Sequence, residues 1–457
     1  MEKTEHALTL KEAKFEFNEL FFSITDQDST IRSGNDVFVR ISGYTKEELL
    51  GSFHNIIRHP DMPKVIFKTL WDYLLDDKPI VAYVKNKTKQ GGYYWVLAAV
   101  FPLEDRYISI RIKPNTKLLA AAKELYPKLL KAESVRGMDD SSRILPELLQ
   151  ALGYENYDRF MNDALLQELN WRQNNVSPAV IHDDYEILRP SLKKLKSVYG
   201  YSCELMSQYD AWFEKIDLFT QVKSTFEEKG QKLRELARDI VFLSLNASVS
   251  SYKVESGGET FGVLASDIRS NAKENEALIS RIDEIVQHFS DALNTVIFAV
   301  AGMRLQIEMV TYFIQEVSTK NSAIQIPELI ANISDLVALV AQYADKSKHI
   351  QAKLDQEIQD ALKNLNQLEQ QMMYLGYIQI YGIIEAAGSH DESVRFGVIF
   401  SQLKSLVQET TAEIEVMQKI GGDFSAENRN MIEKSHEIDL RLRNLTEEIS
   451  AIMQYEE

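Results

Sequence analysis

The sequence is poor in cysteine, in positive charge and in long apolar runs. Among 457 residues only Cys203 is a cysteine, so no internal disulfide can form and a reducing cytoplasm is the expected compartment. The net charge of −17 argues against nucleic-acid binding, which needs a clustered basic surface. The most apolar segment, residues 291–314, is interrupted by Arg304 and Glu308. It is therefore no match for a transmembrane helix, and we expect no membrane insertion.

Proline is scarce after the first 190 residues. Nine of the ten prolines lie at or before Pro190, and only Pro327 follows. Long proline-free stretches with apolar residues every three or four positions are typical of long helices. The N-terminal third instead has short β-rich runs, and Gly91 and Gly92 lie between two of them as a hairpin turn. The sequence therefore predicts an α+β domain followed by a mainly α-helical region.

These shifts in composition predict five segments. We expect an N-terminal tail over residues 1–16, an α+β domain over 17–114, a helical connector over 115–200, and two helical hairpins over 201–322 and 323–457. The sequence shows no Cys/His spacing of a metal site, no glycine fingerprint of a nucleotide loop and no nucleophile elbow. It offers no catalytic residue and no metal ligand, so we expect a protein that is not an enzyme.

The helical region contains an internal repeat. Residues 245–268 align with residues 380–403 without a gap, so that Phe261 matches Phe396. In each copy a proline-free helical pattern reaches a short polar stretch and then resumes, as in a helical hairpin. Pro327 falls between the two hairpins, where it suits the first turn of a helix.

The repeat predicts four long helices, at about 200–255, 259–318, 328–388 and 393–455. We expect the pair Gly421–Gly422 to weaken or kink the last of them. Two fused hairpins can bury their apolar stripes against each other as a long antiparallel four-helix bundle or coiled coil. The chain would then be a monomeric pseudo-dimer. In the alternative arrangement, each hairpin packs on another protomer.

The turns of both hairpins resemble the signalling hairpin of methyl-accepting chemotaxis proteins. The resemblance rests on LSLNASVSSYKVESGGETFGVLASDIR in the first copy and on EAA, Phe396 and Val398 in the second. Family receptors carry one hairpin and dimerise, so this chain resembles a degenerate, tandemly duplicated form. The resemblance implies that the tips bind a chemotaxis histidine kinase, its coupling adaptor or a chemoreceptor array. The partner-binding candidates are Asn246, Lys253, Glu255, Phe261, Glu385, Asp391 and Phe396.

Residues 20–112 show the order of elements of a PAS-like domain. A strand, a turn, a second strand and a short helix are followed by Thr45, which suits a helix N-cap, and by Gly51, which suits a helix end. Next comes an amphipathic helix, a hairpin of two strands, and a last strand over YISIRIK that closes the sheet. The apolar stripe of that amphipathic helix is Val65, Phe67, Leu70, Trp71 and Leu74. We expect a ligand cavity beneath the helices.

A more specific resemblance is carried by HNIIRHPDMP, residues 54–63, together with GNDVF, SGY, VKN and YYWV. These motifs are similar to those of the flavin-binding PAS domain of bacterial aerotaxis receptors. The resemblance implies a non-covalently bound FAD that acts as a redox sensor. It also implies the cofactor-binding candidates, which are Asn35, Arg58, His59, Asp61, Trp71, Asn86 and Trp95.

The chemistry of these residue types suits a flavin. Arg58 and His59 can offer charge-assisted donors to the pyrophosphate or the reduced ring, and the Asn86 amide can bind the polar edge of the ring. The two tryptophans can stack on it. On the residues alone, however, His59 also suits a turn, Arg58 and Asp61 suit a surface ion pair, and Trp71 suits a core position.

Two classes of function therefore remain. The first is a cytoplasmic signal-transduction protein that senses redox or oxygen status through the flavin and relays it to the helical bundle, for energy taxis or array modulation. The second is a flavin-free scaffold with a vestigial PAS domain, because Ile80 replaces a tryptophan that the aerotaxis family usually has. A flavoenzyme is disfavoured, since no nicotinamide fingerprint is present.

Overall fold

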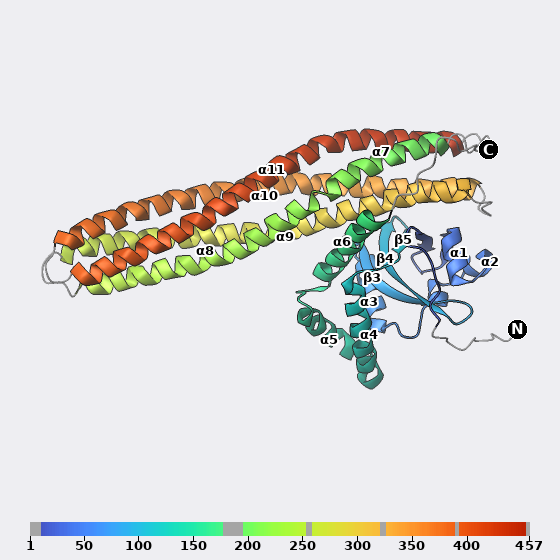
Figure 1. Ribbon diagram of the computed structural model, residues 1–457, viewed down its shortest axis with the longest axis horizontal. Helices are drawn as coiled ribbons and strands as arrows, with labels where there is room; N and C mark the ends of the chain where they lie inside the picture. Colours follow the sequence, from blue (N-terminus) through green and yellow to red (C-terminus); the bar gives the residue numbers. More distant parts are fainter. Residues whose placement is uncertain (1–10, 177–194, 253–257, 320–325, 389–392, 454–457) are drawn as a thin grey trace. The chain divides into compact units, whose positions relative to one another are not determined.

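The structure is a computed structural model that describes residues 11–176, 195–252, 258–319, 326–388 and 393–453. The chain divides into two compact units. The first comprises Met1–Phe213, Ile297–Ser347 and His436–Glu457, and the second comprises Glu214–Val296 and Lys348–Ser435. The prediction of an α+β domain followed by a mainly helical region is confirmed (Figure 1).

The α+β domain is built on a five-stranded antiparallel sheet with strand order β2-β1-β5-β4-β3. Gly91, with φ +85°, lies in the turn between β3 and β4, as expected for a hairpin. The elements in chain order are β1 (Phe21–Asp26), β2 (Ile31–Gly34), α1 (Asp36–Ser42), α2 (Lys46–Leu49), the 3-10 helix η1 (His54–Ile57), α3 (Lys64–Leu75), β3 (Ile80–Lys87), β4 (Tyr93–Leu103) and β5 (Arg106–Ile112).

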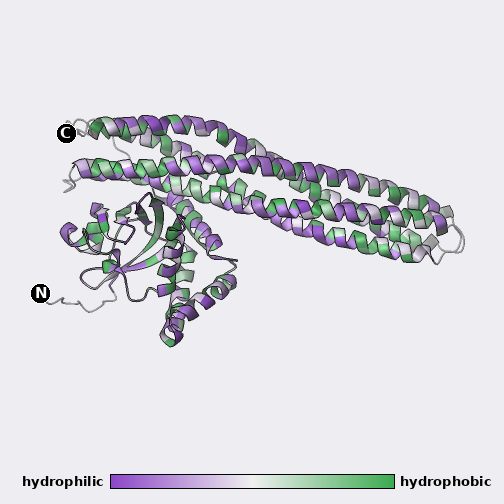
Figure 2. Cartoon of the chain, turned by 180° about the vertical axis from the view of Figure 1, so that it is seen from behind, coloured by the Kyte–Doolittle hydropathy of each residue, from purple (hydrophilic) through white to green (hydrophobic). Residues whose placement is uncertain are grey.

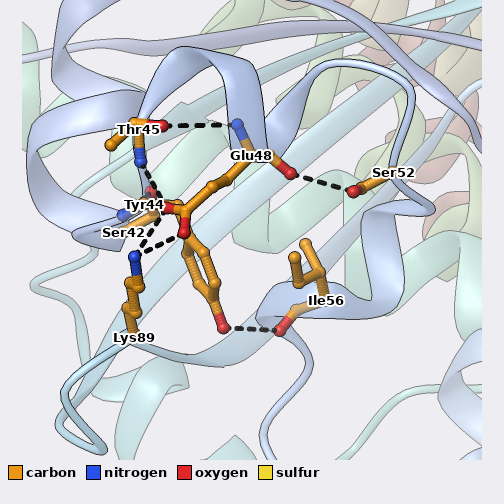
Figure 3. Close-up of polar contacts among 7 residues, drawn as sticks. All are labelled: Ser42, Tyr44, Thr45, Glu48, Ser52, Ile56 and Lys89. Atoms are coloured by element: carbon orange, nitrogen blue, oxygen red, sulfur yellow. Dashed lines mark hydrogen bonds and ion pairs between the residues drawn. The ribbon is translucent and has the colours of Figure 1, made fainter. Parts of the chain in front are cut away.

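Helix α2 and the loop after it are fixed by local hydrogen bonds (Figure 3). Thr45 and Glu48 form a capping box, in which each side chain accepts from the backbone N–H of the other. Gly51 then adopts φ +77°, a conformation that suits glycine. The Tyr44 hydroxyl donates to the Ile56 carbonyl at 3.4 Å and so ties η1 to the end of α1. The predicted N-cap and the predicted end of this helix are both confirmed.

The sheet has two buried faces. We call the face packed against α1, η1 and α3 the inner face, because Arg111 contacts His54 of η1 and Tyr107 contacts Trp71 of α3. Side chains alternate along a strand, so Ser109 also lies on the inner face. The strand pairing of Asn86 with Tyr94, and the stacking of Tyr94 on Phe21, place these three side chains there as well.

The opposite face, which we call the outer face, is covered by helices. Trp95 packs against Tyr126 of α4, and Tyr83 packs against Phe160 of α6. Phe22 contacts Phe313 of α9, within the same compact unit. The covering helices are α4 (Lys117–Arg136) and α6 (Tyr157–Asn175), together with parts of α9 and α10. Helix α5 (Met138–Ala151) packs on α3, α4 and α6. The outer face is therefore a core between the sheet and these helices.

The long helices largely follow the predicted boundaries. The expected first helix is divided by a turn at residues 214–215, whereas the other three are continuous. The elements are α7 (Leu195–Phe213), α8 (Ile216–Ser251), α9 (Gly258–Thr319), α10 (Ile326–Gly388) and α11 (Ser393–Met453). Figure 2 shows hydrophobic and hydrophilic residues intermixed along the long helices.

In the second unit the segments of α8, α9, α10 and α11 pack together around an apolar interior. Phe289 of α9 contacts Phe226 of α8 and Phe424 of α11. The repeat-related residues Phe261 and Phe396 stack with ring centroids 4.0 Å apart. The two copies of the repeat therefore meet through equivalent residues of one chain.

The pair Gly421–Gly422, which we expected to weaken or kink the last helix, does not interrupt it. Helix α11 continues through both residues. A Cβ atom at Gly421 would lie 3.1 Å from side-chain atoms of Leu362 and Phe226. Glycine is used here because neighbouring helices approach the backbone closely, and this close packing supports the helix.

The apolar segment of α9 lies inside the protein. Among the described residues, α9 contains one window that could cross a membrane by length and composition, and 83% of that window is buried. Arg304 and Glu308 within this segment form ion pairs with Asp210 and Arg172, respectively. The segment is a core helix of the structure, as its interrupting charges indicated.

Candidate ligand-binding site

The loop of residues 54–63 runs beside β3, the edge strand of the sheet. Its start is held by the His54 N–H, which donates to the Ser29 carbonyl at 2.9 Å. Farther along, Arg58 forms an isolated antiparallel bridge with Asn86 of β3. The loop then enters α3, whose first two free N–H groups, at Lys64 and Val65, donate to the Glu133 carboxylate of α4. These contacts fix the loop between η1, β3 and the connector.

His59 and Asp61 lie at the edge of the sheet. The Asp61 N–H donates to His59 Nδ1 at 3.1 Å, which is the turn arrangement that the following proline suggested. Asp61 pairs with Lys85 at 2.5 Å. Burial, with a further contribution from the nearby Lys85, lowers the pKa of His59 below 6.5. His59 is therefore largely neutral at pH 7 and can accept or donate one hydrogen bond.

Arg58 does not pair with Asp61, contrary to the surface ion pair considered above. Its guanidinium lies over the Phe67 ring at 4.0 Å, and Nη2 donates to the Met62 carbonyl at 3.2 Å. The side chain thus stabilises the first turn of α3 by a cation–π contact.

Asn35 uses its whole amide in this structure. Oδ1 accepts from the N–H groups of Phe22 and Phe38, which makes Asn35 the N-cap of α1. Nδ2 donates to the Leu20 carbonyl at 2.8 Å and to Glu316 Oε2 of α9 at 3.1 Å. An amide can make four such bonds, so Asn35 joins the sheet, α1 and α9 and keeps no group for a ligand.

The two tryptophans lie on opposite sides of the sheet. Trp71 of α3 faces the inner side, with its ring 5.9 Å from that of Tyr107. Trp95 pairs with Lys85, one position from Asn86, so its side chain points to the outer face and packs on Tyr126. The structure therefore brings Trp71 and Asn86 to the inner face and leaves Trp95 outside it.

The inner face holds a group of buried polar atoms without hydrogen-bond partners. Within the described part of the chain, the buried atoms Asn86 Nδ2, Tyr94 Oη, Ser109 Oγ and Arg111 Nη1 make no well-formed hydrogen bond. The Asn86 amide still lies close to the Tyr94 hydroxyl, where it partly offsets the rise in the pKa of Tyr94 that burial causes. Such atoms are rare in folded proteins, because each costs roughly 1–3 kcal/mol when it is desolvated without compensation. Four of them on one face of one sheet are the arrangement expected where a polar ligand binds.

Arg111 is the charged member of this group. Its Nη2 donates to Ser23 Oγ at 3.0 Å and contacts His54 Nε2 at 2.6 Å. Burial, offset in part by Tyr94, lowers the pKa of Arg111 to about 10, so the guanidinium remains charged at neutral pH. Burial together with the charge of Arg111 holds the pKa of His54 well below 6.5. Neutral His54 therefore accepts a hydrogen bond from Arg111.

Sequence reasoning missed Arg111, Tyr94, Ser109 and His54 as site residues. A signal was present in the last strand, where Ile108, Ile110 and Ile112 alternate with Tyr107, Ser109 and Arg111. A strand that is buried on both faces and still carries a serine and an arginine on one of them indicates a polar function for that face. Only the sheet register shows that Asn86 and Tyr94 share it.

The predicted tip residues fall into three groups. Asn246 is exposed on α8, and Glu385 is half-buried on α10. Phe261 and Phe396 are buried against each other, so both rings face the interior. Lys253, Glu255 and Asp391 lie outside the described residues.

The fold and the position of this site define a class of protein. Residues 32–110 match the family model of the PAS fold. The first relative is the aerotaxis receptor of Escherichia coli (strain K12), 43% identical over 112 residues, which are 23% of this chain and 22% of that protein. The N-terminal domain is therefore a PAS domain similar to that of the aerotaxis receptor. The chain spans about a fifth of the length of that relative.

Other similarities cover the same part of the chain. Phototropin-2 of Oryza sativa subsp. japonica is 25% identical over 141 residues, 28% of this chain and 16% of that protein. The nitrogen fixation regulatory protein of Klebsiella pneumoniae is 28% identical over 81 residues, 18% of this chain and 16% of that protein. Among solved structures, the LOV domain of the blue-light photoreceptor Aureochrome1 is 20% identical, with TM-score 0.21, and covers 22% of this chain and 88% of that one.

Proposed function

We propose that this protein is a redox or oxygen sensor that binds FAD on the inner face of its PAS sheet. The observation that carries the proposal is the group of buried, unpartnered polar atoms of Asn86, Tyr94, Ser109 and Arg111. Similarity of the domain to the aerotaxis receptor supports it. We assign the chain to signal transduction rather than catalysis, since two of the relatives above carry the names of a receptor and a regulatory protein.

The residues present are chemically suited to a flavin. Asn86 and Tyr94 would bind the polar edge of the ring through their free amide and hydroxyl groups. Trp71, half-buried on α3, would offer an aromatic surface beside it. Bound flavin would supply a redox centre whose charge and hydrogen-bonding pattern change on reduction. The inner face could register that change because its polar atoms have no other partners.

The signal would pass to the helices through contacts made by β2, by Asn35 after it and by the start of β5. Asn35 donates to Glu316, and Ser33 accepts from the amide of Asn332 at 2.8 Å. Arg106, at the start of β5, pairs with Asp335 at 3.0 Å. We propose that these contacts, besides the connector, carry the state of the PAS domain into α9 and α10, the receptor-like helices.

The second compact unit would bind a partner. A stripe of exposed apolar side chains follows one side of α10, with Tyr377 71% and Ile384 64% exposed. The full stripe is Met373, Tyr374, Tyr377, Ile380, Tyr381 and Ile384. The repeat places Phe242, Leu245 and Val249 at positions equivalent to Tyr377, Ile380 and Ile384, and these are exposed too. A contiguous stripe of exposed apolar side chains is typical of interaction sites.

We propose that this partner is the chemotaxis histidine kinase, its coupling adaptor or a chemoreceptor array. The resemblance of the repeat to a duplicated chemoreceptor hairpin favours these partners. A cytoplasmic location follows from the same proposal and agrees with the single thiol, Cys203.

Purification of the full chain, with FAD added, tests the proposal. We expect a yellow protein whose visible absorbance bleaches on anaerobic reduction and returns in air. Mass spectrometry of the released cofactor would separate FAD from FMN. The Asn86→Leu variant should hold much less flavin, whereas Arg32→Gln, a change on the exposed side of β2, should hold the wild-type amount. A colourless wild-type protein that stays colourless with excess FAD would support the flavin-free scaffold instead.

A further inference from the structure

We propose that Arg111, positioned by His54 and Ser23, is the receptor for the negative charge of the bound flavin, and that it favours the reduced cofactor over the oxidised one. This inference rests on the proposed flavin function and concerns the regulation of that site. It assigns to one residue the setting of the redox range in which the sensor switches.

The first argument is the missing counter-charge. Arg111 is 4% exposed, and among the described residues no carboxylate lies within 4 Å of its guanidinium. A buried charge without a partner is strongly unfavourable. Its neighbours at hydrogen-bond distance, Ser23 and His54, are neutral. The site therefore lacks an anion.

The second argument is a comparison with the other buried arginines of this chain. Within the described residues two more arginines are buried, Arg172 and Arg304. Arg172 pairs with Glu308 at 2.7 Å, and Arg304 pairs with Asp210 at 2.7 Å. The chain thus supplies a carboxylate wherever an arginine is buried for structural reasons. Arg111 is the exception, and it lies on the face that holds the other unpartnered polar atoms.

The third argument is that one terminal nitrogen of the Arg111 guanidinium is left without a hydrogen-bond partner. Nη2 is occupied by Ser23 and His54, whereas Nη1 is buried and has no partner. The guanidinium lies 5.5 Å from the centre of the Phe38 ring, which stacks on His54. Two neutral acceptors and an aromatic ring therefore hold the side chain in place and leave one N–H pair for an anionic ligand group.

The expected preference follows from charge. When the oxidised ring takes up two electrons and one proton from an external reductant, it gains one negative charge. A fixed cation in a water-excluded site stabilises that charge more than it stabilises the neutral oxidised ring. Arg111 would therefore raise the affinity for reduced FAD relative to oxidised FAD and raise the midpoint potential of the bound cofactor.

The test measures the midpoint potential and the flavin content of the full-length protein under anaerobic reduction with dithionite. We expect Arg111→Gln to lower the ratio of reduced to oxidised affinity at least tenfold, which is about 30 mV for a two-electron couple. Arg111→Lys, which keeps the charge, should retain most of the wild-type potential. Arg32→Gln is the matched control because Arg32 is an exposed arginine of the same domain.

The outcomes separate the two proposals. If wild-type protein binds neither form of FAD, the flavin function itself fails and the assignment of Arg111 fails with it. If wild-type protein is yellow and Arg111→Gln keeps its potential and flavin content, only the assignment of Arg111 is wrong. Equal loss of both forms in Arg111→Gln and Arg111→Lys, with a lower melting temperature, would show a purely structural role.

A milder variant covers the case in which Arg111→Gln does not fold. Ser23→Ala removes one of the two positioning contacts and leaves the charge in place. We expect a smaller decrease of the potential in the same direction. A folded Ser23→Ala protein with an unchanged potential would count against the positioning part of the proposal.

Discussion

The inner and outer faces of the PAS sheet are both buried, but they differ in how their polar groups are satisfied. On the outer face the Tyr83 hydroxyl donates to Glu168 at 3.0 Å, and the Tyr126 hydroxyl donates to the Tyr83 carbonyl at 2.6 Å. On the inner face Tyr94 and Ser109 have hydroxyls without partners. The same sheet therefore has one face whose polar groups are bonded within the fold and one that holds unpartnered polar groups, where we propose that flavin binds.

This difference explains why burial alone is a poor guide to function here. Glu168 is almost fully buried and is a structural residue, since it accepts from Asn115, Thr116 and Tyr83. Arg111 is about as buried, but among the described residues no carboxylate pairs with its guanidinium. Changes on the outer face should therefore affect stability, and changes on the inner face should affect ligand binding.

The largest expected effect is that of Glu168→Gln on the outer face. The carboxylate accepts from the N–H groups of Asn115 and Thr116 and from the hydroxyls of Thr116 and Tyr83. We expect the free energy of unfolding to fall by about 3 kcal/mol, because buried donors lose a charged acceptor. Urea unfolding of flavin-free protein measures it. A loss below about 0.5 kcal/mol would contradict the structural role of the outer face.

Asn35→Ala should have the next largest effect. Asn35 caps α1 and also links the sheet to Glu316. We expect a loss of about 2 kcal/mol from the cap and the buried donors together. A double-mutant cycle with Glu316→Gln should show a coupling of about 1 kcal/mol. Additive effects in that cycle would show that the link to α9 does not form in solution.

Acid should destabilise the inner face through His54. Its folded-state pKa lies well below 6.5, because of burial and the charge of Arg111, whereas the unfolded residue titrates near 6.5. Unfolding therefore takes up a proton below pH 6.5, so this part of the stability is complete above that pH and is lost as the pH falls. The slope can reach about 1.4 kcal/mol per pH unit.

His54→Gln, which keeps an acceptor for Arg111, should flatten this pH dependence between pH 6.5 and 5. Unfolding at a series of pH values measures the slope. His288→Gln is the matched control, since His288 is an exposed residue of α9. A slope that His54→Gln leaves unchanged would mean that His54 is not neutral in the folded protein.

Ser109→Ala should have the smallest effect on the flavin-free protein. The change removes an unpartnered hydroxyl from the inner face, so we expect the free energy of unfolding to stay constant or to rise by up to about 1 kcal/mol. FAD binding should weaken in the same variant. The measurement combines urea unfolding with flavin titration, and a loss of stability similar to that of Glu168→Gln would remove the distinction between the faces.

Much of the fold could be predicted because it depends on local patterns. The cap at Thr45, the turn at Gly91 and the amphipathic pattern of α3 are each written in a few adjacent residues. The proline-free pattern likewise predicts the long helices. The turn at residues 214–215, which divides the expected first helix, has neither glycine nor proline, so no local signal marked it.

The site was predictable only in part. Its residues come from different strands, and the sequence does not show which strands pair or in which register. Asn86 and Trp71 followed from the motifs and do lie on the inner face. Trp95 was chosen from the YYWV motif of the resemblance, but one step in register places it on the outer face. Arg111 and Tyr94 are brought together by strand pairing, which the sequence alone does not specify.

The central claim is that the polar atoms of the inner face serve a bound flavin and not the fold. Unfolding of wild-type and Asn86→Leu protein, each with and without FAD, tests it most directly. We predict equal stability of the two flavin-free proteins, and a gain of about 2.7 kcal/mol for wild type at a flavin concentration of 100 times its Kd, with little gain for the variant. A flavin-free Asn86→Leu protein that loses several kcal/mol, together with no gain from FAD in wild type, would contradict the claim.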